Sequence, residues 1–195
     1  MNPRRRLWIA IGGFVALLAI GVWLVFAKLP SVLQQDPAGA TATTTGTKSG
    51  DARKIQATLF YVADDGAELM PVGREVLYGA TPSEQAKYIV EAQVAAPPAG
   101  MVSAIAANTK VRGVFLGSRG DAYVDLGAEA ATAHTGGSLN EALAVFAIVN
   151  ALVSNLPGVT SVQILVDGKE VDTLAGHVDL RQPLSRASKW VRKAQ

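Results

Sequence analysis

The sequence predicts an α+β domain with one mostly antiparallel sheet, in the order ββαββαββ, and two helices packed on that sheet. Three observations support this prediction. Segments rich in β-branched residues occur in pairs joined by short turn sequences. Two longer segments with helical periodicity separate these pairs, and each opens with a capping pattern. An uninterrupted apolar run near the N-terminus stands apart from them and predicts one transmembrane helix that precedes the domain.

The apolar run extends from Leu7 to Ala27 and contains no charged residue. As a helix it would be about 31 Å long, close to the ~30 Å hydrocarbon core of a bilayer. A basic triplet precedes the run: Arg4, Arg5 and Arg6. Because basic charge stays on the cytoplasmic side, residues 1–6 are expected inside the cell. We therefore expect a single-pass protein of the inner or plasma membrane whose domain lies outside it.

A cleaved signal peptide is the alternative interpretation of this run. Val25-Phe26-Ala27 offers a small-residue cleavage site, but the run is longer than the roughly 7–15 apolar residues of such peptides. The sequence therefore favours a retained transmembrane helix over residues 7–27. The chain has no cysteine, which excludes a lipoprotein anchor and any disulfide.

Residues 28–53 form the predicted linker, because they are small, polar and without periodicity. Charge is distributed unevenly around the domain that follows. Residues 28–180 carry 10 basic and 16 acidic side chains, a net charge of −6, whereas residues 181–195 hold five basic side chains and no acidic one. An acidic body outside the cell argues against a nucleic-acid partner.

The domain is predicted over residues 54–184 and starts with two strands, 55–62 and 69–78. They flank the turn sequence Asp64-Asp65-Gly66. Pro71 and Gly73 within the second segment indicate an edge strand or a bulge.

A helix is expected to begin at Thr81, where Pro82 suits the first turn and Glu84 completes a capping box. It should end before Pro97-Pro98. Residues 99–109 are expected to form a loop.

A second strand pair is predicted over 110–116 and 122–126. Ser138 and Glu141 form another capping-box pattern, which predicts a longer helix that stops near Asn155.

A third pair, 159–166 and 169–174, surrounds the turn sequence Asp167-Gly168. Residues 185–195 are the predicted basic C-terminal tail, expected to be a solvated end unless it rests on anionic lipid or cell-wall polymer.

An ordered set of short segments gives the domain a family resemblance. They are Ala96–Pro98, Ser103–Ile105, Asn108–Lys110, Ala122–Leu126, Gly136–Ser138, Ala147–Asn150, Gln163–Lys169 and Thr173–Leu180. With these segments the domain resembles the GerMN domain of the sporulation and spore germination family, in a single-domain, membrane-anchored form. The resemblance implies an extracytoplasmic α+β domain without known catalytic chemistry, similar to the ring-building modules of secretion complexes. Two features differ from the spore germination proteins, which have tandem domains and are often lipoproteins.

The glycine-rich segment before the second helix is the candidate ligand or partner contact: His134, Gly136, Gly137 and Ser138. Free amide groups at a helix N-terminus can bind an anion, although a flexible capping loop is the simpler interpretation. His177 and Asp179 would share one side of an extended segment, but two ligands do not make a zinc site. We expect no metal, no cofactor and no catalytic residue.

The sequence thus predicts a non-catalytic binding or assembly module of the bacterial cell envelope. Its expected partners are the bilayer and either other envelope proteins or further copies of itself. The alternative is a cell-wall or small-anion binder, or an envelope enzyme, that uses the loop around His134 and the strand ends near Asp125. This alternative requires a concave pocket at that loop.

Overall fold

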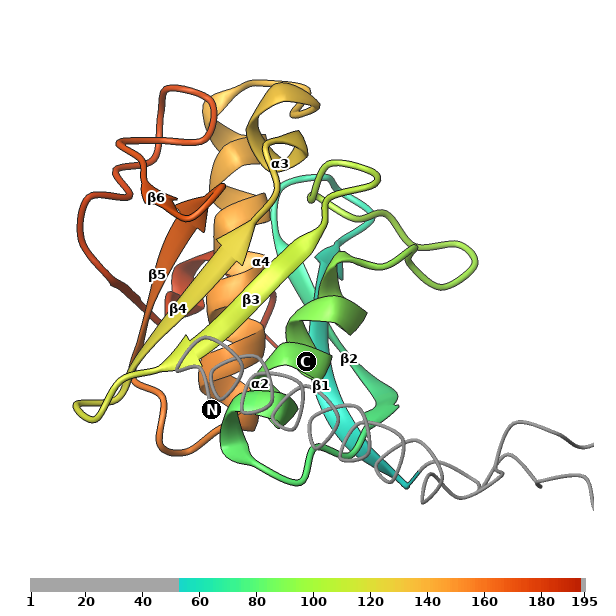
Figure 1. Cartoon of the computed structure of the whole chain (residues 1–195). Coiled ribbons are helices and arrows are strands. Elements are labelled where there is room, and N and C mark those ends of the chain that lie inside the picture. Colours follow the sequence, from blue (N-terminus) through green and yellow to red (C-terminus); the bar gives the residue numbers. More distant parts are fainter. Residues whose placement is uncertain (1–52, 194–195) are drawn as a thin grey trace, which may run out of the picture. The chain divides into compact units, whose positions relative to one another are not determined.

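The computed structural model describes residues 53–193 (Figure 1). The predicted transmembrane helix, Leu7 to Ala27, lies outside the described residues, as do Arg4, Arg5 and Arg6 and nearly all of the predicted linker. The domain contains two sheets and three α-helices, so its class is α+β as predicted.

The first sheet consists of two antiparallel strands, β1 (Lys54–Val62) and β2 (Leu69–Leu77). Their register is continuous from one end to the other, so β2 contains no bulge. Pro71 and Gly73 lie at exposed positions of β2, which is an edge strand. The predicted first strand pair is therefore confirmed, and of the two interpretations of Pro71 the edge strand is correct.

Helix α2 (Pro82–Val94) begins as its sequence predicts. Thr81 Oγ1 accepts a hydrogen bond from the backbone N–H of Glu84 at 3.2 Å. Glu84 Oε2 in turn accepts from the backbone N–H of Ala80 at 2.7 Å, one residue before the position expected in a capping box. Both hydrogen bonds fix the turn between β2 and α2.

The second sheet differs from the prediction of one mostly antiparallel sheet. It contains β3 (Val111–Leu116), β4 (Asp121–Leu126), β5 (Ser161–Val166), β6 (Lys169–Glu170) and β7 (Leu184–Ser185). Its order is β3-β4-β5-β6, and β7 also pairs with β5. The predicted strand segments are divided between two sheets, and the last of them, 169–174, is a strand only at Lys169–Glu170. Within the second sheet β4 and β5 are parallel, because α4 (Ser138–Asn155) returns the chain to the end of the sheet where β4 began.

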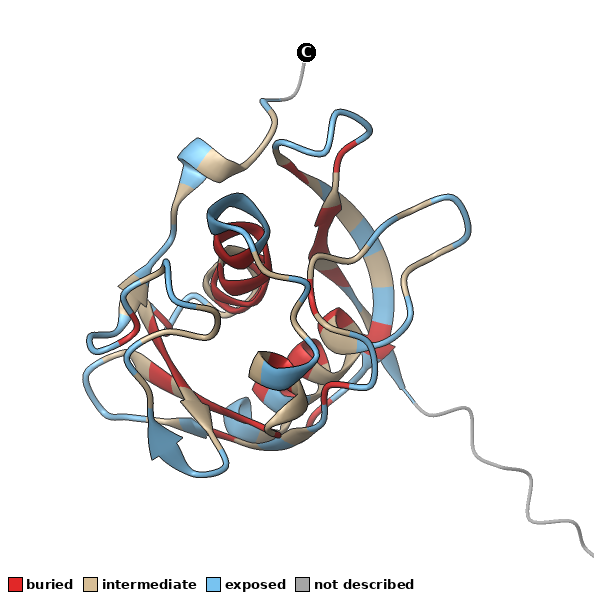
Figure 2. Ribbon diagram, turned by 90° about the horizontal axis from the view of Figure 1, so that it is seen from above, coloured by how far each residue is buried: buried red, intermediate tan, exposed pale blue. Residues whose placement is uncertain are grey.

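Helix α4 forms the centre of the domain. Figure 2 shows it nearly end-on between the two sheets, with α2 beside it. The short helix α3 (Glu129–Thr132) lies between β4 and α4 in the chain. Among the described residues, α4 is the helix whose length and mean hydropathy of 1.3 would suit a membrane span, and 61% of that span is buried inside the domain. We attribute its apolar character to this core position.

Side-chain amides from two helices cover the edge of β1 that does not face β2. Gln93 of α2 accepts from the backbone N–H of Phe60 and donates to its carbonyl, both at 2.8 Å. Asn155 of α4 does the same at Thr58, again at 2.8 Å for both bonds. Each side-chain amide therefore makes the two backbone hydrogen bonds that a neighbouring strand would otherwise make. Because these backbone groups are occupied, β1 cannot pair with another strand at Thr58 and Phe60.

Residues assigned by sequence to the C-terminal tail also contribute to the domain. The predicted boundary at residue 184 falls inside β7, and the 3₁₀ helix η1 (Ser188–Trp190) follows. The ring of Trp190 stacks on that of Phe146 of α4 with a centroid distance of 6.1 Å.

Candidate functional site

The glycine-rich loop before α4 has a backbone that only glycine adopts easily. Gly136 and Gly137 have φ angles of 80° and 87°. His134 Nδ1 accepts a hydrogen bond from the backbone N–H of Gly136 at 3.0 Å, so in the neutral ring Nε2 carries the proton. Nε2 is buried and has no hydrogen-bond partner among the described residues.

The predicted capping box at Ser138 is wrong. Ser138 is the first residue of α4, and the cap position is Gly137, which provides no side chain. Glu141, the expected partner of Ser138 in the box, turns away from the helix start and becomes fully buried. Its contacts with a distant segment replace the local hydrogen bond that the sequence pattern predicts.

Glu141 binds the segment that follows β6. Its Oε1 accepts from the backbone N–H groups of Leu174 and Ala175 at 2.9 Å each. Its Oε2 accepts from the backbone N–H of His177 at 2.8 Å and lies 3.1 Å from His177 Nδ1. Burial raises the pKa of Glu141, but the backbone N–H groups, led by that of Ala175, outweigh burial and leave its pKa below the ordinary value.

His177 and Asp179 do not form the start of a metal site. His177 contacts Glu141, whereas Asp179 pairs with Arg181, whose Nη2 lies 2.7 Å from Asp179 Oδ2. Hydrogen bonds from the Arg181 side chain and backbone lower the pKa of Asp179 to about 2. Within residues 53–193 no three His, Cys, Asp or Glu side chains come together as metal ligands.

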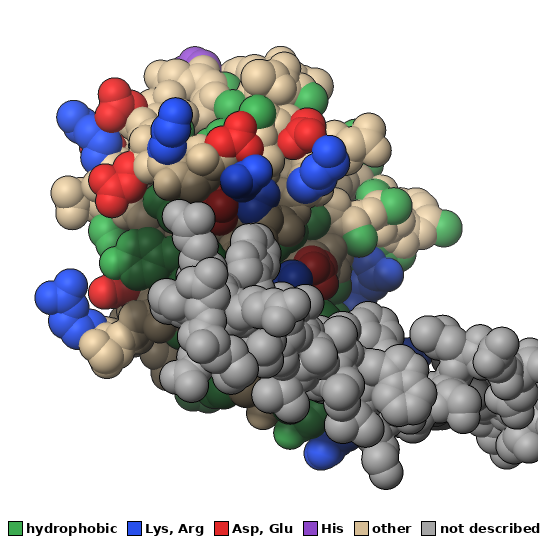
Figure 3. Space-filling model, in the orientation of Figure 1, with side chains coloured by type: hydrophobic (Ala, Val, Ile, Leu, Met, Phe, Trp, Pro, Cys, Tyr) green, Lys and Arg blue, Asp and Glu red, His purple; other side chains and the backbone are tan. Residues whose placement is uncertain are grey.

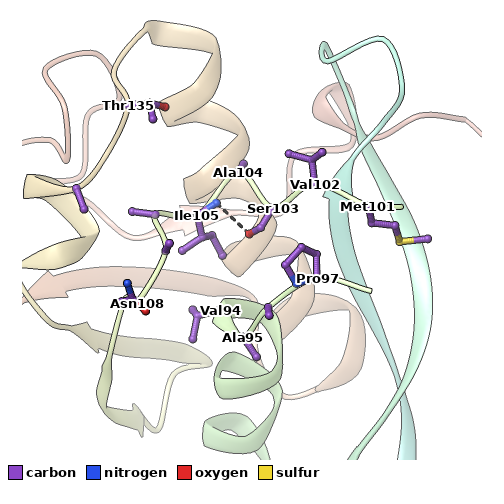
Figure 4. Close-up of a pocket in the computed structure, with 14 residues that line it drawn as sticks. Val94, Ala95, Pro97, Met101, Val102, Ser103, Ala104, Ile105, Asn108 and Thr135 are labelled. Carbon is purple, nitrogen blue, oxygen red and sulfur yellow. Dashed lines mark hydrogen bonds between the residues drawn. The ribbon is translucent and has the colours of Figure 1, made fainter. Parts of the chain in front are cut away.

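A pocket of about 600 Å³ lies beside the glycine-rich loop. Its lining comes from Val94 at the end of α2 with the following residues 95–97, from the loop 101–108, and from two residues next to His134, namely Ala133 and Thr135. Figure 4 shows Thr135 on one side of the cavity and Val94 with Pro97 on the other. None of the described residues that line the pocket carries a charge.

Polar groups in the pocket are few and uncharged. Ser103 Oγ accepts a hydrogen bond from the backbone N–H of Ile105 at 3.1 Å, which fixes the bend of the lining loop (Figure 4). Asn108 and Thr135 add an amide and a second hydroxyl. Val102 is 63% exposed, the largest exposure among the large hydrophobic side chains of the described residues. This chemistry suits an apolar or uncharged ligand.

The four predicted contact residues lie next to this pocket and do not line it. His134, Gly136, Gly137 and Ser138 are all outside the lining, although Ala133 and Thr135 belong to it. The main wall of the pocket is the loop 101–108, a segment whose sequence predicts only a connecting loop. The available signal was the presence of Met101, Val102 and Ile105 in a segment without strand or helix periodicity.

Asp125 lies apart from the glycine-rich loop and the pocket, on the outer face of the five-stranded sheet. Its Oδ1 accepts from the backbone N–H of Gly168 at 2.7 Å, and its Oδ2 lies 3.1 Å from Arg112 Nε. Arg112 also reaches Asp167 at 3.4 Å. Figure 3 shows acidic and basic side chains close together on this face. Because the charges are paired, Asp125 stabilises the β5–β6 turn and does not complete a site with His134.

The family model "Germane: Sporulation and spore germination" matches residues 58–172. No curated protein matches the chain.

Solved structures also match the chain, at low sequence identity. The tandem GerMN domains of the sporulation protein GerM from Bacillus subtilis are 17% identical, with a TM-score of 0.49, over 68% of this chain and 46% of that chain. The first GerMN domain alone has the same identity, TM-score and coverage of this chain, over 98% of its own length. A lipoprotein candidate from Clostridium perfringens is 20% identical, with a TM-score of 0.48, over 68% of this chain and 87% of that one.

Proposed function

Because this chain belongs to the Germane (sporulation and spore germination) family, we propose that its domain is a non-catalytic binding and assembly module of the bacterial cell envelope. The pocket carries this proposal. It is large enough for a small ligand or a few residues of a peptide, and the side chains that line it offer neither an acid nor a base for catalysis. Recognition by shape and apolar contact is the chemistry that such a lining supports.

The sequence supports a position outside the cell for this module. The apolar run Leu7–Ala27 is long enough to span a bilayer, and Arg4, Arg5 and Arg6 favour a cytoplasmic N-terminus. In this arrangement the linker would hold the domain close to the outer side of the membrane. Its partners would be other envelope proteins that reach this layer.

The chemistry of the pocket also indicates the kind of segment that would fit. Alanine, valine and proline side chains leave a lining of small apolar surfaces, so a charged side chain would lose its hydration there without gaining a partner. We therefore propose that an uncharged segment of a partner protein, with small apolar side chains, binds in the pocket. Ser103, Asn108 and Thr135 would provide hydrogen bonds to its backbone.

A photo-crosslinker placed in the chain tests this function in intact cells. Benzoylphenylalanine at Val102 would report on the pocket, and the same residue at Phe115 is the matched control. The two positions are 63% and 60% exposed, and Phe115 lies on the five-stranded sheet, outside the pocket. We expect a discrete adduct with one envelope protein from position 102 and much less from position 115.

The opposite pattern would contradict the pocket proposal. An adduct only from position 115 would place the binding surface on the outer face of the five-stranded sheet. No adduct from either position would contradict binding of a protein at both surfaces and favour the second candidate function below.

The second candidate is a cell-wall or small-anion binder, or an envelope enzyme, that uses the His134–Ser138 loop. Two consecutive left-handed glycines before α4 favour it, as does the Nε2 of His134, which has no hydrogen-bond partner within residues 53–193. Alanine substitutions at His134 and Ser138 test it directly. An unchanged phenotype of cells with both substitutions, together with loss of the position-102 adduct after Ala104→Glu in the pocket lining, would favour the protein-binding function instead.

A further inference from the structure

The C-terminal arm, residues 184–193, lies beyond residue 172, where the family match ends. It begins by pairing with the five-stranded sheet, where Ser185 of β7 lies opposite Ser161 of β5. It then crosses α4, where the backbone N–H of Ala187 donates to Asn150 Oδ1 at 3.1 Å. Asn150 is fully buried, so the arm satisfies an amide that would otherwise lack this partner.

The second half of the arm reaches the two-stranded sheet. Trp190 stacks on Phe146 with an interplanar angle of 25°. Val191 forms a parallel bridge with Leu69 of β2, and the backbone N–H of Arg192 donates to the Leu69 carbonyl at 2.9 Å. The arm therefore runs from one sheet, over the central helix, to the other sheet (Figure 2).

Charge complementarity accompanies these contacts. Arg192 Nη2 lies 2.6 Å from Asp65 Oδ2, and its Nε lies 3.7 Å from Glu68 Oε2. Both acids belong to the β1–β2 turn region, whereas residues 181–195 contain five basic residues and no acid. We call the surface that the arm covers the seat; it includes Ser161, Asn150, Phe146, Leu69, Asp65 and Glu68. The seat is acidic at Asp65 and Glu68, where it meets the basic Arg192 of the arm.

The arm is joined to the domain by a short exposed connection. The connection consists of Arg181, Gln182 and Pro183, which are all exposed. Arg181 forms its ion pair with Asp179, which precedes the connection, and not with a residue of the arm. Every contact of the arm described above lies beyond this connection. A change of backbone angles at residues 181–183 would therefore release the arm as a unit while leaving the rest of the domain intact.

We propose that the arm exchanges between two copies of this chain, so that the arm of each copy occupies the seat of the other. Two copies carry the same arm and the same seat, and the exchanged contacts are identical to the internal ones. Only residues 181–183 differ between the closed and the exchanged form. Trp190 Nε1 of the arm is buried without a hydrogen-bond partner within residues 53–193. This inference concerns self-assembly and does not depend on the pocket.

Disulfide trapping tests the exchange, because the chain has no cysteine of its own. Ser161 and Ser185 are directly opposite in the β5–β7 pair, and neighbouring strands bring Cα atoms within disulfide range. One full-length chain would carry Ser161→Cys and a size tag, and a second would carry Ser185→Cys without the tag. Both are co-expressed, so that exchange can occur during folding, and purified together in detergent micelles.

A disulfide between the two chains forms only if the arm of one sits in the seat of the other. We expect a tagged–untagged heterodimer on a non-reducing gel that disappears on reduction. The matched control replaces Ser185→Cys by Ser188→Cys, an exposed serine of the same arm that does not lie opposite Ser161. Its heterodimer yield should be about tenfold lower, since a disulfide requires close Cα atoms.

The double variant Ser161→Cys/Ser185→Cys separates the remaining outcomes. Exchange predicts a covalent dimer at twice the chain mass of 20.3 kDa. A disulfide that forms only within single chains, with no heterodimer in the mixture, would overturn the proposal. Absence of any disulfide in the double variant would overturn it as well, because the arm would then not occupy the seat.

Discussion

The buried carboxylate of Glu141 is expected to be the most sensitive single polar group of this domain. Its two oxygens receive three backbone N–H groups and face the His177 ring, all between 2.8 and 3.1 Å. Glu141→Ala removes the acceptor for all of them and opens a space at the start of α4. Among the described residues, no other group accepts hydrogen bonds from the backbone N–H groups of Leu174, Ala175 and His177 once Glu141 is removed.

The expected loss of unfolding free energy follows from the number of hydrogen bonds that Glu141 accepts and from the exposure of residues 173–178 to water. A hydrogen bond to a charged group contributes roughly 1.5–3 kcal/mol, but such contributions are not additive. Gly176 and His177 are exposed, so water can reach part of the released segment. We expect Glu141→Ala to lower the free energy of unfolding by about 3–4 kcal/mol, which corresponds to a fall in Tm of about 10–15 °C for a domain of this size.

Two further variants test whether the bonds themselves are responsible. Glu141→Gln keeps one carbonyl oxygen for Leu174 and Ala175 and loses the acceptor for His177, so it should cost about half as much. Glu91→Ala is the control, because Glu91 forms an exposed ion pair with Lys87 at 3.7 Å and should change stability by less than about 0.5 kcal/mol.

Urea unfolding of the detergent-solubilised chain measures the total loss, and hydrogen exchange with mass spectrometry locates it. Exchange should accelerate at residues 173–178 in Glu141→Ala. A loss below about 1 kcal/mol, or unchanged exchange in this segment, would refute the reasoning, because the bonds would then contribute no more than an ordinary surface contact.

The same carboxylate makes stability depend on pH. The folded pKa of Glu141 lies below its ordinary value of 4.5, so the folded state favours the charged form. This contribution is complete above about pH 4.5 and is lost as the pH falls through the folded pKa. Glu141→Gln should therefore show a smaller decrease in unfolding free energy between about pH 5 and pH 3 than the parent chain.

Further predictions concern the edge of β1, the β2–α2 turn and the membrane topology. Gln93→Ala should cost about 2–4 kcal/mol in urea unfolding, because it leaves two buried backbone groups of β1 without partners; a cost below about 1 kcal/mol would contradict this role. Gly79→Ala should lower the Tm, since an added Cβ would collide with the backbone nitrogen of Gln85, and an unchanged Tm would refute the collision. In intact cells, Ser49→Cys should react with an impermeant maleimide and Asn2→Cys should not; labelling at Asn2 would reverse the predicted orientation.

Local patterns predicted most elements of the fold. The two long strands of the first sheet, the start of α2 at Thr81 and the stop of α4 at Asn155 all follow from residues within one or two turns of each feature. Alternation, capping and turn chemistry act over such short distances, so the sequence alone carries them. The family resemblance could also be read directly from short segments, and the family match confirms it.

The sequence predicted a loop next to the candidate site but not the residues that line the pocket. The sequence drew attention to His134–Ser138, and the pocket lies beside this loop. Its main wall, residues 101–108, has no periodicity that sequence reasoning can use. A cavity arises where separate segments meet, and the distance between the end of α2 and residues 133–135 is set only by the packed domain.

What the sequence by itself determined is the class of the domain, the existence and approximate bounds of its main strands and helices, and its family. Only the tertiary structure decided which strands became neighbours. It divided the strands between two sheets, made β4 and β5 parallel, and turned Glu141 from an expected helix cap into the buried partner of residues 174–177. Strand pairing and burial of a carboxylate depend on contacts between residues far apart in the chain, and local propensity does not specify these contacts.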